Sequence, residues 1–207
     1  MNINEMRERI LTLKRQGQGG YHSPEEIDRF LNDASNDKFN EEKRLFELNG
    51  YISDNLSNFK TRATVTLIAG LGDKPSDYDY RTNASTIAGL KIEIVPEGEW
   101  IERLADPIAI VSATRPICAI REQIQISPSS LASMTLYYLK RPATMVFGYT
   151  EDGDGNEIYD AGSSTDSDWP ISCHTDLILR ALSYAGVSLP DKVMMEGKQF
   201  KKVMEGV

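Results

Sequence analysis

The stretch RATVTLIAGL, residues 62–71, marks the point where the sequence changes from helical to strand-like character. It is short, apolar and rich in β-branched residues, as strands are. Before it, apolar residues recur at spacings of three and four, which is typical of one face of a helix. After it come further strand patterns and then helical patterns again. This order predicts an α+β protein with N-terminal helices, a central antiparallel β-sheet or sandwich, and C-terminal helices.

The part before this stretch carries three apolar stripes at helical spacing. The first predicts an amphipathic helix over residues 3–15, which the glycines of QGQGG (16–20) end. The second helix begins at Ser23, since Ser23 and Glu26 have the spacing of a capping box, and it has a weak point at 35–37. The third stripe predicts a further helix that packs on other helices, and it comprises Leu45, Leu48, Ile52, Leu56 and Phe59.

The central part alternates between apolar and polar side chains. PICAIREQIQISP (116–128) predicts a strand with one apolar face, made of Cys118, Ile120, Ile124 and Ile126. SMTLYYLKRP (133–142) and ATMVFGY (143–149) alternate as well, and Pro142 makes their junction a bend or an edge. Trp100 and Trp169 stand beside glycine and proline, so we expect them to anchor the edges of the sheet.

Two helical patterns close the chain. The first ends at Gly186, and the second follows Pro190. We therefore expect an N-terminal helical segment (1–60), an antiparallel β domain (61–170) and C-terminal helices (171–207), in one compact unit. The last helix has an apolar face that fits either packing in the core or docking of a partner, because methionine adapts to irregular surfaces. The candidate docking residues on this face are Met194, Met195, Phe200 and Val203.

Composition excludes several classes of function. The net charge of −8 and the pI near 4.9 argue against a protein that grips nucleic acid, because affinity for phosphates comes largely from Lys and Arg. No apolar run approaches the roughly 20 residues of a membrane span. MNINEMRERILTLKRQG (1–17) lacks the apolar centre of an export signal, so Cys118 and Cys173 are expected to be reduced, buried thiols.

The acidic stretch YTEDGDGNEIYD (149–160) could be a calcium loop, an acidic catalytic cluster or the tip of a β-hairpin. In an EF-hand register that starts at Asp152, Glu157 occupies the position of the required glycine and Ser163 that of the bidentate glutamate. Asp-Gly pairs, by contrast, are favoured in hairpin turns. We interpret this stretch as a turn and expect no metal site.

No catalytic constellation emerges from the sequence. Cys173 and His174 are neighbours at the start of a helix and therefore point in different directions. GLGD (70–73) lacks the further glycine and the Lys-Ser/Thr pair of a phosphate loop. The sequence therefore favours a structural or interaction protein that is not an enzyme and needs no cofactor.

One region resembles a known family. Residues 136–189 are similar to the C-terminal half of neck ring proteins of tailed phages, most of all those of crAss-like phages and other Bacteroidetes phages and prophages. The shared features are a Tyr-Tyr pair, a basic-proline bend, a hairpin, an acidic-aromatic-proline step, and a helix that ends in Ala-Gly-Val/Ile. They correspond to Tyr137-Tyr138, Arg141-Pro142, the turn at 151–157, Ser167-Asp168-Trp169-Pro170, and Ala185-Gly186-Val187. Residues 115–128 fit the strand before the Tyr-Tyr pair.

The resemblance implies a virion protein that forms a head-to-tail connector ring, commonly of twelve copies, between portal and tail. Its partners would be further copies of itself, the portal protein, and tail or other neck proteins, with DNA only as non-specific cargo and no membrane. The location would be the virion neck, and the host cytoplasm during assembly. Two alternatives stay open: a small soluble protein-binding module of a bacterial or prophage accessory protein, and an enzyme whose site is assembled from scattered Asp, Glu and Tyr residues.

Overall fold

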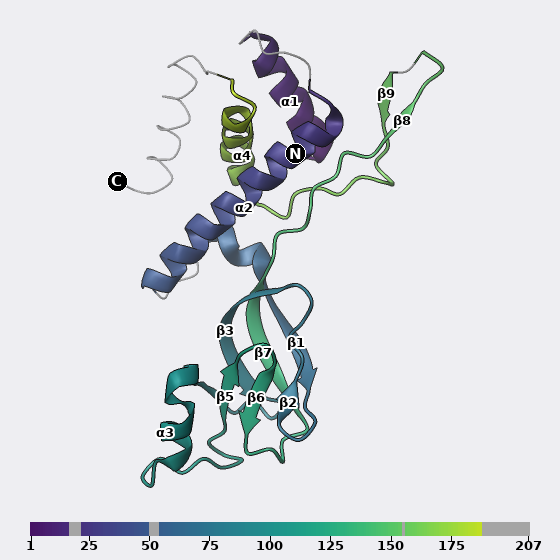
Figure 1. Ribbon diagram of the computed structural model, residues 1–207. Coiled ribbons are helices and arrows are strands. Elements are labelled where there is room, and N and C mark those ends of the chain that lie inside the picture. The colour runs from purple at the N-terminus through teal and green to yellow at the C-terminus, as the bar shows by residue number, and fades with distance from the viewer. Residues whose placement is uncertain (17–21, 50–53, 155, 188–207) are drawn as a thin grey trace. The chain divides into compact units, whose positions relative to one another are not determined.

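Helices and strands follow one another along the chain in the predicted order (Figure 1). The computed structural model describes residues 1–16, 22–49, 54–154 and 156–187. Contacts divide the chain into two compact units. The helical unit comprises residues 1–58 and 142–207, and the β unit comprises residues 59–141. The predicted α+β class, with N-terminal helices, mostly antiparallel strands and a C-terminal helix, is confirmed.

Three helices form the core of the helical unit: α1 (Ile3–Gln16), α2 (Pro24–Asn49) and α4 (Ile171–Tyr184). Helix α4 contacts both α1 and α2. The predicted apolar stripes are the buried faces, as periodicity requires. Their buried residues are Ile3, Met6, Ile10, Ile27, Leu31, Ala34, Leu177, Ile178, Ala181 and Leu182. The predicted capping box is present, since the Glu26 amide donates to Ser23 Oγ (3.3 Å) and the Ser23 amide donates to Glu26 Oε2 (3.2 Å).

Helix α2 is longer than the sequence predicts. It continues through 35–37, because the hydroxyl of Ser35 accepts a hydrogen bond from the indole of Trp169 (2.8 Å) instead of competing for the helix backbone. The third stripe is not one helical face. Leu45 and Leu48 are exposed near the end of α2, whereas Leu56 and Phe59 are buried in a separate 3-10 helix, η1 (Asp54–Phe59). Ile52 lies outside the described residues.

Residues after Pro142 are held by one polar face of α2. Asn32 exchanges two hydrogen bonds with the backbone of Met145 (2.8 and 2.9 Å), and Asp28 accepts the amide of Phe147 (2.8 Å). These contacts satisfy backbone groups that would otherwise pair in a strand. As a result, the predicted alternation over 143–149 buries Met145 and Phe147 without forming a strand before Tyr149.

Strands β8 (Tyr149–Glu151) and β9 (Glu157–Tyr159) then form a two-stranded antiparallel hairpin. Arg7 of α1 holds it in place, since it pairs with Glu157 beside the turn and lies over the ring of Phe147 before the hairpin, 4.2 Å from the centroid. Such a short pair has little stability of its own and depends on contacts of this kind.

Two sheets form the β unit. One has the order β1-β7-β3, and the other has the order β2-β6-β5-β4, in which only β4 and β5 are parallel. The strands are β1 (Lys60–Thr66), β2 (Leu71–Gly72), β3 (Tyr78–Thr86), β4 (Glu93–Ile94), β5 (Ile117–Ile120), β6 (Ile124–Ser127) and β7 (Ser133–Lys140). A short 3-10 turn, η2 (Glu97–Glu99), leads into helix α3 (Trp100–Ala105).

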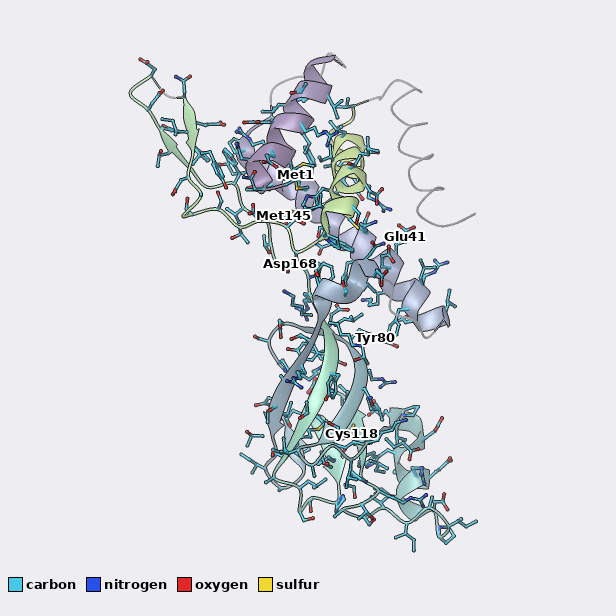
Figure 2. The ribbon with its side chains drawn as sticks, turned by 180° about the vertical axis from the view of Figure 1, so that it is seen from behind. Met1, Glu41, Tyr80, Cys118, Met145 and Asp168 are labelled. Carbon is cyan, nitrogen blue, oxygen red and sulfur yellow. The ribbon has the colours of Figure 1, made fainter. Side chains whose placement is uncertain are left out.

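The sheets enclose one apolar cluster, and Figure 2 shows Cys118 among these strands. Its members include Val65, Leu67, Ala84, Ile92, Cys118, Ile124, Ile126, Met134, Leu136 and Tyr138. The predicted alternation of β7 is confirmed, since Met134, Leu136 and Tyr138 are buried on one face. The single strand predicted over 116–128 is wrong: it is the β5–β6 hairpin, with a turn at residues 121–123.

The boundaries of the units differ from those expected. The chain enters and leaves the β unit through neighbouring strands, because Lys60 of β1 pairs with Leu139 of β7. Residues 142–170, expected in the β domain, belong to the helical unit, since α2 binds their backbone. The structure thus has a β unit inserted into a helical one, where the sequence predicted three consecutive segments in one compact unit. The predicted helix after Pro190 lies outside the described residues.

Candidate interaction surfaces

Exposed isoleucines gather on α3 and the loop that follows it. Ile101 of α3 is 78% exposed, and Ile108 and Ile110 of the loop are 90% and 68% exposed. The loop is ordered by Asp106, whose carboxylate accepts the amides of Ile108 (2.8 Å) and Ala109 (3.2 Å). Three exposed isoleucines within residues 101–110 make this segment a candidate interaction surface, since large exposed apolar patches mark such surfaces.

A cleft of about 280 Å³ lies beside this loop. Its lining residues are Lys91, Glu93, Arg103, Ala109, Thr114, Arg115 and Pro116. They carry three positive charges and one negative charge, in a chain whose net charge is −8. Its volume is below the roughly 300–1,000 Å³ of ordinary small-molecule sites, which suits side chains that enter from a partner.

Arg103 and Glu93 form the fixed part of the cleft. Arg103 Nη2 lies 2.8 Å from Glu93 Oε2, and its Nη1 lies 3.3 Å from Asp106 Oδ2 and donates to the carbonyl of Ala109 (3.2 Å). The hydrogen bond from Arg103 lowers the pKa of Glu93, and the charges of Lys91 and Arg115 lower it further. Glu93 is therefore ionised and paired at neutral pH.

Lys91 and Arg115 are the two cations of this cleft that could pair with a carboxylate of a partner. Both are exposed, and neither forms an ion pair within the ranges that the structure describes. They come from different places in the sequence, before β4 and before β5, and meet because β4 and β5 are neighbours. The sequence analysis did not identify these two residues, since an isolated lysine or arginine before a strand does not indicate a binding site. The loop could have been recognised from DPIAIVSATRP (106–116). This segment is bounded by two prolines, and it contains isoleucines although its sequence predicts neither a helix nor a strand.

The β8–β9 hairpin offers the opposite charge. Glu151 and Asp154 are exposed, and Ile158 of β9, which lies opposite Thr150, is 52% exposed. The turn is built as predicted, because Asp152 Oδ1 accepts the amides of Asp154 (2.9 Å) and Asn156 (2.8 Å). The interpretation as a turn is thus confirmed. In the described part of the chain, no three His, Cys, Asp or Glu residues are grouped to hold a metal ion.

The Cys173-His174 neighbours are not arranged as a nucleophile and its base. Both cysteines are free and buried, as expected. Burial raises the pKa of Cys173, and it raises that of Cys118 to about 12, so both are thiols at neutral pH. His174 Nε2 lies 2.9 Å from the carbonyl oxygen of Trp169, to which it donates, and Nδ1 is buried with no partner among the described residues.

This placement of His174 predicts acid sensitivity of the helical unit. Burial lowers the pKa of His174 from 6.5, so the unfolded chain takes up the proton at a higher pH than the folded one. Stability from the neutral ring is therefore present above about pH 6.5 and is lost as the pH falls below it. We expect the free energy of unfolding to fall between about pH 7 and pH 5, and to fall less steeply in His174→Gln. Urea titrations at several pH values measure this, and equal slopes in both proteins would contradict it.

The tryptophans differ in their roles. Trp100 packs with Val95, Ile117 and Ala119 against β5, as a sheet anchor does. Trp169, expected at a sheet edge, instead lies on α2, where its indole binds Ser35. That prediction is wrong for Trp169, because the segment around it belongs to the helical unit.

The docking residues predicted from the sequence, Met194, Met195, Phe200 and Val203, lie outside the described residues, so their role stays a prediction. Among the helices that the structure describes, none is both long and apolar enough to cross a membrane. Comparison with known proteins finds no matching family model and no matching curated protein.

Proposed function

We propose that the protein is a structural subunit of the neck of a tailed phage. In this function, copies form a ring between portal and tail through which DNA passes, and the ring contains no catalytic site. The virion neck is its final location, and the host cytoplasm is where it is assembled. The resemblance of residues 136–189 to neck ring proteins suggests this class.

The observation that carries the proposal is that the chain bears two unlike surfaces of opposite charge. A closed ring is built from head-to-tail contacts, which require two different and complementary faces on every copy. The cationic cleft with its exposed isoleucines is one such face, and the acidic hairpin is another. The overall negative charge suits a channel for DNA, because like charge repels the phosphates and lets the duplex slide.

A second candidate function is a protein-binding module of an accessory protein. The isoleucines around Ile108 favour it, since a single apolar patch is enough for a one-to-one partner. Such a module has no need of a second, complementary face.

The test is to purify the protein alone and together with the portal protein of the same genome, and to measure particle mass by light scattering and electron microscopy. We expect closed rings of uniform copy number, either free or seated on the portal, and we expect the chain in purified virions by mass spectrometry. A protein that stays monomeric in both preparations and is missing from virions would overturn the proposal and favour the binding module.

A further inference from the structure

We propose that the acidic β8–β9 hairpin of one copy inserts into the cationic cleft of the next copy, and that this contact joins the copies. The inference rests on the proposed ring function and deepens it, since it names the two faces that meet. The acceptor side is the cleft with Lys91 and Arg115, together with the exposed Ile108 and Ile110 that flank the lining residue Ala109 in the sequence. The donor side is Glu151, Asp154 and Ile158.

The charge of the hairpin is complementary to the charge of the cleft. The cleft holds two exposed cations that lack an ion-pair partner in the described ranges, and the hairpin holds two exposed carboxylates. Complementary charge steers encounter and fixes register, whereas like charges across an interface cost several kcal/mol. A contact made in this way weakens with added salt.

The apolar side chains fit the same arrangement. Ile158 is exposed on β9 and lies opposite Thr150, on the other face of the hairpin from Glu151. Ile108 and Ile110 are exposed on either side of Ala109, which lines the cleft. Interfaces commonly combine an apolar centre with a polar rim, and these two faces supply both parts.

The hairpin is shaped to reach a neighbour. Arg7 of α1 pairs with Glu157 beside the turn, Tyr149 donates to Glu25 of α2 (3.0 Å), and the backbone before the hairpin is bound to α2. Glu151 lies opposite Glu157, and Asp154 lies in the turn. Within the helical unit, β8 and β9 extend away from the three helices (Figures 1 and 2). A hairpin whose two strands are already held in place loses little conformational entropy on insertion, because it is ordered before the contact forms.

Two charge-reversal variants test the contact. One reverses the hairpin, Glu151→Lys with Asp154→Lys, and the other reverses the cleft, Lys91→Glu with Arg115→Glu. We expect each variant alone to associate at least about tenfold more weakly than the unchanged protein, because like charges now face each other. An equimolar mixture should regain assembly, since the reversed hairpin meets the reversed cleft and the two unchanged faces also meet. Sedimentation velocity measures association with and without the portal protein.

Matched controls reverse exposed charges elsewhere in the same units. Asp33→Lys with Glu47→Lys changes the charge of α2 as much as the hairpin variant does, and Lys60→Glu with Arg62→Glu changes the β unit as much as the cleft variant does. Both controls should assemble as the unchanged protein does.

Each other outcome overturns the contact in a distinguishable way. If rings form and both reversed variants form them equally well, the hairpin does not enter the cleft, although the ring function stands. If the cleft variant loses portal binding while the hairpin variant assembles normally, the cleft receives an acidic segment of the portal. If the unchanged protein never associates, with or without the portal, both the contact and the ring function are wrong.

Discussion

Replacing Trp169 by alanine should lower the free energy of unfolding of the helical unit by about 3–5 kcal/mol. Its side chain is 3% exposed, and its indole nitrogen donates to Ser35 Oγ at 2.8 Å. Its carbonyl accepts the hydrogen bond of His174, and Lys38 Nζ lies 5.5 Å from the ring centroid. The truncation therefore leaves a cavity between the segment before α4 and helix α2, and it leaves the buried hydroxyl of Ser35 without the indole.

Lys38 increases the expected cost. It is 6% exposed, and its ammonium lies 2.9 Å from Asp176 Oδ2 on α4. A buried charge depends on good geometry of its ion pair, and the indole of Trp169 covers this pair from one side. Loss of the ring admits water beside Lys38 and weakens the link between α2 and α4.

The measurement is urea unfolding followed by far-ultraviolet circular dichroism, which reports mainly on the helices. Trp169→Phe is the matched control: it keeps most of the ring and removes the hydrogen bond to Ser35, so it should cost about 1–3 kcal/mol. Equal stability of the alanine variant and the unchanged protein would show that Trp169 does not support the helical core.

Leu136→Ala should destabilise the β unit by about 2–5 kcal/mol and leave the helical unit unchanged. Leu136 is fully buried on the central strand β7, where it pairs with Ala63 of β1 on one side and Ala84 of β3 on the other. Both neighbours are small, so the surrounding side chains have little to fill the cavity with. The effect is confined to one unit because Leu136 belongs to the apolar cluster of the β unit.

The two tryptophans allow this to be measured, since Trp100 lies in the β unit and Trp169 in the helical unit. In Trp169→Phe and Trp100→Phe backgrounds, fluorescence follows one unit at a time. Thr135→Ala is the control, because Thr135 faces away from the cluster on the same strand and should change stability by less than about 0.5 kcal/mol. If both fluorescence transitions shift together in Leu136→Ala, the two units unfold as one.

Local patterns predicted individual elements well. The capping box depends only on Ser23 and Glu26, which are three positions apart in one turn of helix, so it appears in the structure as predicted. The alternation of β7 was also correct, because a strand buried on one face shows its period directly. The alternation over 116–128 led to the wrong prediction of a single strand. The turn between β5 and β6 at 121–123 is so short that the alternation of apolar residues continues across it.

The charged cleft could not be predicted in the same way. Lys91 and Arg115 are separated in sequence and become neighbours only through the pairing of β4 with β5. The polar face of α2 was equally hidden: Asp28 and Asn32 belong to no motif or apolar stripe of the sequence, but they bind the backbone of Phe147 and Met145. No local pattern shows which distant backbone a helix side chain will meet.

The sequence by itself determined the α+β class, the helices α1, α2 and α4 with their buried stripes, the main strand β7 and the acidic turn. These follow from periodicity and turn chemistry, which act between residues a few positions apart. Only the tertiary structure decided that residues 59–141 form an inserted unit, that Trp169 packs on a helix, and that cations gather in one cleft. These features arise from packing and strand pairing between segments far apart in the chain, where the free energy depends on contacts that no local pattern records.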